Sequence, residues 1–178
     1  MKFSAYDKAD ESGIRTLFVE SFAVSEGPSE GALIGRLVRD LLNETESREV
    51  FGFVVTERGK IIGCIFFTRL VYDAPVDVFL LSPVAVHTDY QGKGIGQRLI
   101  RFGLDRLRDK GVQCVFTYGD PGFYSKVGFV RVSEEIAQAP FELTHPEGWL
   151  GQSLDGSRVK PLSGRPRCMK PFDIPELW

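Results

Sequence analysis

The segment that decides the fold is Leu81-Ser82-Pro83-Val84-Ala85-Val86-His87-Thr88-Asp89-Tyr90-Gln91-Gly92-Lys93-Gly94-Ile95-Gly96. Its first six residues are mostly apolar, which predicts a buried strand, and residues 95–110 have the apolar spacing of an amphipathic helix. The glycines between them predict a tight turn whose backbone N–H groups converge at the positive end of the helix dipole. Lys93 adds a positive charge there. The segment therefore predicts a binding site for a phosphate or pyrophosphate.

Two common nucleotide-binding patterns do not fit this turn. A P-loop would need glycine where His87 stands, and Ser or Thr after Lys93, where the chain has Gly94. A Rossmann fingerprint would need glycine where Gln97 stands. Both mismatches disfavour a protein that uses the turn to bind ATP or NAD.

The pattern Gln91-x-x-Gly94-x-Gly96, after a strand that carries Val84 and Val86, resembles the acetyl-CoA signature of the GNAT N-acetyltransferase superfamily. A second segment, Phe123-Tyr124-Ser125-Lys126-Val127-Gly128-Phe129, is similar to the family's aromatic–Tyr–x–Lys–x–Gly–Phe segment. The sequences of residues 81–86 and of Pro171-Phe172-Asp173 resemble those of the YhbS-like subgroup. The resemblance covers residues 2–132.

This resemblance implies an acyltransferase that moves an acetyl group from acetyl-CoA to a primary amine by direct attack. It assigns the backbone N–H of Val84 to the thioester carbonyl, and a donor of this kind lowers a barrier by about 3–4 kcal/mol. It assigns Tyr124 as the general acid for the departing thiolate. The residues that it assigns to the cofactor are Val84, Ala85, Val86, Gln91, Gly92, Lys93, Gly94, Ile95, Gly96 and Gln97.

The sequence departs from the family pattern in two places. Many members carry an acidic residue on the strand before the signature, but residues 79–81 are apolar here and Ser82 is the nearest polar side chain. Glu26 and Glu30 are weaker candidates for the general base, which the sequence does not identify. Gly119-Asp120 replaces an Asn that often contacts the pantetheine arm. The missing carboxylate keeps an alternative open, a non-catalytic acyl-CoA-binding sensor or docking module.

The rest of the chain predicts an α/β (α+β) domain with a mixed, mostly antiparallel sheet that is splayed at its middle and flanked by helices. The stretch 24–31, with its glycines and proline, predicts a loop. We expect residues 1–133 to form the acetyltransferase-like domain. Residues 134–178 hold six of the ten prolines, and we expect them to form an extension packed on the same domain, with a strand over 158–162. The other expected strands are 2–6, 49–56, 61–72, 76–86, 112–118 and 129–132, and the expected helices are 9–22, 30–42, 95–110 and 121–126.

The composition is that of a soluble globular protein, with 43% hydrophobic and 26% charged residues among 178. A net charge of −2 disfavours general binding to nucleic acid, and no apolar run reaches the ~18 residues of a membrane span. Three cysteines and a start without a long apolar stretch favour the cytoplasm. His87 and His145 lack partners at metal-ligand spacing, so no metal is expected. The expected partner is an amine, on a small molecule or on a peptide or protein, and exposed sheet edges make a homodimer a reasonable expectation.

Overall fold

The computed structural model describes residues 1–178, in which seven strands form one sheet in the order β1-β2-β3-β4-β5-β7-β6. β4 pairs with β5 in parallel, whereas the β1–β2, β5–β7 and β6–β7 pairs are antiparallel. The predicted mixed, mostly antiparallel sheet is confirmed. The strands are β1 (Lys2–Ala5), β2 (Val50–Glu57), β3 (Lys60–Leu70), β4 (Val78–Val86), β5 (Cys114–Tyr118), β6 (Val130–Arg131) and β7 (Trp149–Ser153), and the α-helices are α1 (Glu11–Glu26), α2 (Pro28–Glu44), α3 (Ile95–Asp109) and α4 (Pro121–Tyr124).

The helices and strands predicted before residue 134 are all present, and their ends differ from the prediction by at most two residues except at the end of α1. That exception makes the predicted loop over 24–31 wrong. Gly27 alone separates α1 from α2, because its φ of 102° breaks the helix. Pro28 then opens α2, where its missing N–H leaves no helical hydrogen bond unmade. Glu26 and Glu30 therefore lie on helices.

The chain divides into two compact units. The first consists of Met1–Phe67 and Pro83–Gly103, and the second of Thr68–Ser82 and Leu104–Trp178. The chain passes between them within β3, β4 and α3. The glycine-rich turn lies in the first unit, and the aromatic segment around Tyr124 lies in the second.

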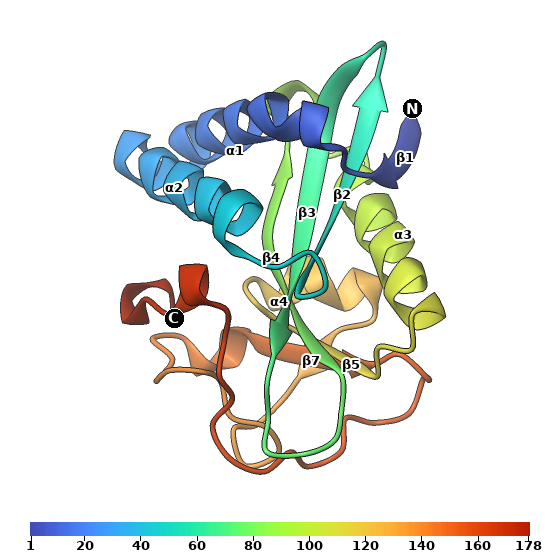
Figure 1. Cartoon of the computed structure of the whole chain (residues 1–178), viewed down its shortest axis with the longest axis vertical. Helices are drawn as coiled ribbons and strands as arrows, with labels where there is room; N and C mark the ends of the chain where they lie inside the picture. The colour runs from blue at the N-terminus through green and yellow to red at the C-terminus, as the bar shows by residue number, and fades with distance from the viewer. The chain divides into compact units, whose positions relative to one another are not determined.

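The core of the first unit is built on both faces of β3. Phe66 packs against Phe18 of α1, with ring centroids 6.0 Å apart. Phe67, the next residue, packs against Phe53 and lies against Gly103 of α3. Because successive side chains of a strand point to opposite faces, α1 and α3 cover opposite faces of this strand layer. α2 lies side by side with α1 (Figure 1).

An aromatic core holds the second unit together. Trp149 of β7 stacks on Phe116 of β5, with ring centroids 4.9 Å apart and ring planes 4° apart. Trp178 packs against Trp149 and against Tyr118, with centroids 6.2 Å and 6.3 Å apart. Both indole N–H groups donate to backbone carbonyls, so burying them leaves no polar atom unpaired. The late part of the chain therefore contributes directly to this core.

The strand predicted over residues 158–162 is wrong, since the strand of this region is β7. It pairs with β5 on one side and β6 on the other. Trp149 and Leu150 are buried in the pairing, whereas Arg158 and Lys160 are exposed. Pro161 has no N–H to give to a neighbouring strand. Residues 149–153 form the strand instead, because they bury the Trp149 indole and each of them has a backbone N–H to give to a neighbouring strand.

None of the helices has both the length and the apolar character needed to cross a membrane. No group of three or more His, Cys, Asp or Glu side chains is arranged to hold a metal ion. All three cysteines are free, and Cys64 and Cys114 are buried.

Candidate functional site

In the first unit, β4 ends in a glycine-rich turn that leads into α3. Along the last residues of β4, Ala85 is buried while Val84 and Val86 are partly exposed, as the alternation of a strand requires. A short 3-10 turn, Thr88–Tyr90, follows. Gly92 and Gly94 then adopt φ angles of 72° and 71°, a region that disfavours any side chain, before α3 begins.

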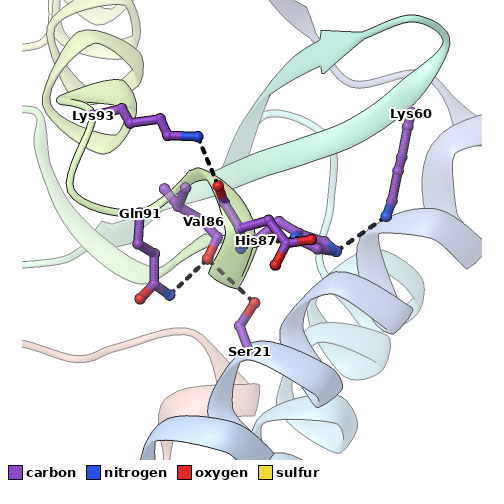
Figure 2. Close-up of polar contacts among 7 residues, drawn as sticks. Ser21, Lys60, Val86, His87, Gln91 and Lys93 are labelled. Carbon is purple, nitrogen blue, oxygen red and sulfur yellow. Dashed lines mark hydrogen bonds and ion pairs between the residues drawn. The ribbon is translucent and has the colours of Figure 1, made fainter.

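Two side chains on the turn hydrogen-bond back to its own backbone (Figure 2). Gln91 Nε2 donates to the carbonyl oxygen of Val86 at 2.9 Å, and Ser21 Oγ of α1 donates to the same oxygen at 3.4 Å. Lys93 Nζ donates to the carbonyl oxygen of Asp89 at 2.8 Å. The side chains of Gln91 and Lys93 therefore help to shape the turn. Because both are used in this way, the groups left to bind a ligand at the centre of the turn are those of the backbone.

The start of α3 presents backbone N–H donors. The first helical bond runs from the N–H of Arg98 to the carbonyl oxygen of Gly94 at 3.1 Å. The four preceding N–H groups consequently have no acceptor within the helix. Around Gly92 and Gly94, no atom lies within 4 Å of where a Cβ would be. Unpaired donors, a helix dipole and open space together fit an anion that approaches the backbone. The four residues that supply these N–H groups are Gly94, Ile95, Gly96 and Gln97.

His87 at the end of β4 links the turn to the neighbouring hairpin. Its Nε2 lies 3.0 Å from Lys60 Nζ on β3, and Figure 2 shows the two side chains pointing toward each other. Its Nδ1 accepts from the backbone N–H of Asp89 at 3.3 Å. Both ring nitrogens are thereby engaged by groups that anchor the loop, which gives His87 a structural place beside the turn.

In the second unit, β4 and β5 pair in parallel over only a short stretch. The pairing covers Val78–Leu80 against Cys114–Phe116, and both strands continue beyond it. At the next position the side chain of Thr117 bridges the strands, because its Oγ1 donates to the carbonyl oxygen of Leu81 at 2.9 Å. The backbone pairing of the two strands therefore ends at Leu80 and Phe116, and the Thr117 side chain makes the next hydrogen bond between them.

Tyr124 ends a short helix that follows β5. Asp120 caps this helix by accepting from the N–H of Gly122 at 2.8 Å, and the Tyr124 ring lies edge-on between Phe123 and Phe129. A Cβ at Gly119 would come within 2.7 Å of the ring. The Gly119-Asp120 pair that replaces the family's Asn thus has its own purpose, since glycine leaves room for Tyr124 and aspartate starts its helix.

The Tyr124 hydroxyl suits a proton donor. Burial raises its pKa above the ordinary value, a hydrogen bond with the Thr117 side chain lowers it, and the charge of Asp120 raises it. Because the pKa is raised overall, the phenol stays protonated at neutral pH. An ionised, nucleophilic phenolate is correspondingly disfavoured.

No carboxylate stands on β4. Val78–Leu81 are buried and apolar, and Ser82 is the one polar side chain of the strand. Glu26 and Glu30 lie at the facing ends of α1 and α2. No general base is assigned among these residues.

The structure brings the predicted cofactor residues from Val84 to Gln97 together in the first unit and places Tyr124 in the second. Sequence reasoning missed Thr117 and Ser21, and it noted Gly119 only as a departure from the family pattern, without its contact with Tyr124. Thr117 carries a signal, because it is the one aliphatic hydroxyl in the run of β5. Its partner Leu81 lies 36 positions away in the chain, and nothing in the sequence indicates that pairing.

Comparison with known proteins finds N-acetyltransferases. The acetyltransferase (GNAT) domain model matches residues 48–131. The uncharacterized N-acetyltransferase YjhQ of Escherichia coli (strain K12) is 33% identical over 181 residues, which cover 98% of this chain and 96% of YjhQ.

Two solved structures share the fold. YhbS of Escherichia coli in complex with CoA superposes with a TM-score of 0.82 at 24% identity, covering 97% of this chain and 92% of YhbS. A GNAT family acetyltransferase from Brucella melitensis in complex with acetyl-CoA superposes with a TM-score of 0.72 at 23% identity, covering 97% of each chain.

Proposed function

The chain belongs to the GNAT family of N-acetyltransferases and is YhbS-like within it, and from this premise we propose that it transfers the acetyl group of acetyl-CoA to a primary amine. The observation that carries the proposal is the turn between β4 and α3. It combines unpaired backbone N–H groups with open space at Gly92 and Gly94. Pyrophosphate, the charged part of the co-substrate, is an anion of the kind that such a helix start binds.

The cofactor residues remain those expected from the sequence. The N–H groups from Gly92 to Gln97 bind the pyrophosphate, and the N–H of Val84 faces the thioester carbonyl. Gln91 and Lys93 support this arrangement indirectly, because their side chains bond to carbonyl oxygens of the turn. The relatives solved with CoA and with acetyl-CoA support the same choice of co-substrate.

The reaction is a direct attack. The amine nitrogen bonds to the acetyl carbon and loses a proton, the carbon–sulfur bond breaks, and the thiolate takes up a proton. Presenting a lysine-like amine in its neutral form at pH 7 costs about 4.6 kcal/mol, given its ordinary pKa of about 10.4. The active site must recover that cost by orienting the amine and stabilising the tetrahedral oxyanion.

Tyr124 is the acid in this proposal. A phenol with an ordinary pKa near 10 gives its proton to a thiolate with a pKa near 8.5 at a cost of about 2 kcal/mol, and burial of Tyr124 raises that cost further. The hydroxyl consequently stabilises the developing thiolate by hydrogen bonding before the proton is transferred. Such acid catalysis contributes about 10²–10⁴-fold to a rate.

One observation favours a second function, an acyl-CoA-binding module without turnover. β4 presents only Ser82 where a carboxylate would assist deprotonation. A thiol-release assay with acetyl-CoA and a broad panel of amines separates the two functions. Thiol release that needs an amine supports the transferase, whereas tight binding of acetyl-CoA without release by any amine supports the binding module.

Three further expectations are kept as proposals. We place a domain boundary between residues 133 and 134, with the extension packed on the domain, and β7 supports the packing because it pairs with β5 and β6. We also propose a cytoplasmic protein and a homodimer. Size-exclusion chromatography with light scattering tests the dimer.

A further inference from the structure

A cavity of about 460 Å³ lies in the second unit, beside the start of β5. It is lined by the end of α3, by the starts of β4 and β5, and by residues between 153 and 162. Its volume is within the range of about 300–1,000 Å³ that is usual for small-molecule pockets. β5 leads from Cys114 at the cavity to Tyr118, about 13 Å further along the strand, and Tyr124 follows that far end. The cavity is therefore separate from the surroundings of Tyr124.

Hydrogen bonds between the walls hold the cavity in shape. The N–H of Gln113 donates to the carbonyl oxygen of Asp77 at 3.0 Å, and the N–H of Leu154 donates to the carbonyl oxygen of Gln113 at 2.9 Å. Arg108 Nε of α3 donates to the carbonyl oxygen of Leu154 at 2.7 Å. Arg108 also pairs with Asp105, which balances its charge. The walls are thus fixed before a ligand enters, which reduces the cost of binding.

The floor of the cavity is aliphatic. Val78, Val112 and Leu154 are buried there, and burying an aliphatic group of a ligand against them is favourable. No aromatic ring lines the cavity, so it offers no stacking surface to a nucleobase. The apolar aliphatic side chains of the lining are Val76, Val78, Val112, Leu154, Val159 and Leu162.

Two side chains of opposite charge, Asp155 and Lys160, line the same cavity. Asp155 Oδ1 accepts from the backbone N–H of Ser157 at 2.8 Å and from its Oγ at 2.6 Å. These hydrogen bonds lower the pKa of the Asp155 carboxyl, so it stays ionised. Both end on Oδ1, and Oδ2 remains available to a ligand. Lys160 acts on Asp155 through its charge but forms no ion pair or hydrogen bond with it. The cavity therefore presents one positive and one negative group that do not pair with each other.

We propose that this cavity binds a free α-amino acid with an aliphatic side chain. The ligand's carboxylate pairs with Lys160, its ammonium group pairs with Asp155, and its side chain packs on the aliphatic floor. A simple anion would meet the charge of Asp155, and a simple amine would meet the charge of Lys160, whereas a zwitterion complements both. The inference does not depend on the proposed function, because the site includes neither the turn between β4 and α3 nor Tyr124.

Titration of ¹⁵N-labelled protein with leucine, followed by amide NMR spectra, tests the proposal. We expect saturable shifts at residues 112–114 and 153–160, with a Kd of about 1 mM or lower. Three analogues each remove one part of the ligand: 4-methylpentanoate lacks the ammonium group, 3-methylbutylamine lacks the carboxylate, and alanine lacks most of the side chain. Each should bind about tenfold more weakly or worse, because a charged hydrogen bond or the burial of the side chain is lost.

Variants assign each charge to its partner. Asp155→Asn, which keeps an oxygen for Ser157, should weaken leucine about tenfold and leave the Kd of 4-methylpentanoate within about twofold. Lys160→Gln should weaken leucine by a similar factor and leave the Kd of 3-methylbutylamine within about twofold. Lys2→Gln, an exposed lysine of β1 in the first unit, is the control and should bind leucine normally. Absence of saturable shifts at about 10 mM leucine, shifts confined to other residues, leucine affinity unchanged in either cavity variant, or an analogue that binds as tightly as leucine overturns the inference.

Discussion

At the scale of single residues, the position of Tyr124 is set by its near neighbours in the chain. Phe123 and Phe129 hold its ring edge-on, and the missing Cβ of Gly119 gives the ring its place. Asp120 starts the helix that presents it. The raised pKa that burial gives the phenol keeps the proton on the oxygen, which is what a donor to a thiolate needs.

Replacing Tyr124 by Phe should lower kcat about 100-fold, within the range that general acid catalysis provides. The Kd for acetyl-CoA should change less than about twofold, because the proposed contacts of the co-substrate are backbone groups of the turn. Kinetics and calorimetric titration measure the two constants. Tyr118→Phe is the control, since that hydroxyl accepts from the N–H of His145 and its loss should leave kcat within about threefold. Unchanged turnover in Tyr124→Phe would remove this residue from the mechanism.

The cysteines should be unreactive in the folded protein at pH 8. Burial raises the pKa of Cys114 to about 12 and that of Cys168 to about 11, and it also raises the pKa of Cys64. Since the thiolate is the reactive form, about one molecule in a thousand or fewer carries it at Cys114 and at Cys168 at pH 8. A thiol-reactive dye should therefore label all three cysteines only after denaturation or at strongly alkaline pH. Rapid labelling of the native protein at pH 8 would contradict this expectation.

The role of an individual residue could be predicted from the sequence where its interaction partners lie nearby in the chain. The glycines of the turn and the aromatic neighbours of Tyr124 are recognisable because their partners lie within a few positions in the chain. The partner of Thr117 was not recognisable, because its hydroxyl bonds to the carbonyl oxygen of Leu81, 36 positions away in the chain.

At the scale of the element, the turn between β4 and α3 acts as a unit. Ser21 and Gln91 fasten it to the carbonyl oxygen of Val86, and Lys93 fastens it to the carbonyl oxygen of Asp89. The positive φ of Gly94 directs the chain into α3. The free N–H groups are thus held in position before any anion arrives, which reduces the cost of binding.

Gly94→Ala should lower the affinity for acetyl-CoA about tenfold or more, because the φ of 71° resists a side chain and a shift of the backbone misplaces the N–H donors. Gly111→Ala is a matched control just beyond the other end of α3, with a φ of 83° and equal open space. Both variants should lose about 1–2 kcal/mol of stability. Only Gly94→Ala should lose affinity in calorimetric titration, and equal affinities in the two variants would exclude the turn as the anion site.

The elements most easily predicted were those whose apolar pattern is set by one packed face, such as α3. The predicted loop failed because a single residue, Gly27, is enough to separate two helices. The strand predicted over residues 158–162 was wrong for a different reason. β7 owes its place to Trp149 stacking on Phe116, a contact between residues far apart in the sequence.

At the scale of the whole molecule, residues late in the chain are part of a core. Trp178 is only 4% exposed and packs against Tyr118 and Trp149. Its carbonyl oxygen accepts from Thr144 Oγ1 at 2.8 Å. These contacts connect it to β5, the strand that carries Thr117 and precedes Tyr124.

Trp178→Ala should lower the free energy of unfolding by about 3–5 kcal/mol, the usual loss for removing a buried aromatic side chain. Urea denaturation followed by circular dichroism measures it. Ile174→Ala serves as the control, because Ile174 is 38% exposed and should cost less than about 1 kcal/mol. A loss below about 1 kcal/mol for Trp178→Ala would mean that the tail does not contribute to the core.

Calorimetric titration of the protein with acetyl-CoA, CoA, ATP and NAD is the most direct test of whether the turn binds acetyl-CoA. We expect tight binding of acetyl-CoA and of CoA, with ATP and NAD binding at least about 100-fold more weakly. Absence of binding by either CoA species, or preferential binding of ATP or NAD, would contradict it, and the proposed acetyl transfer would be withdrawn with it.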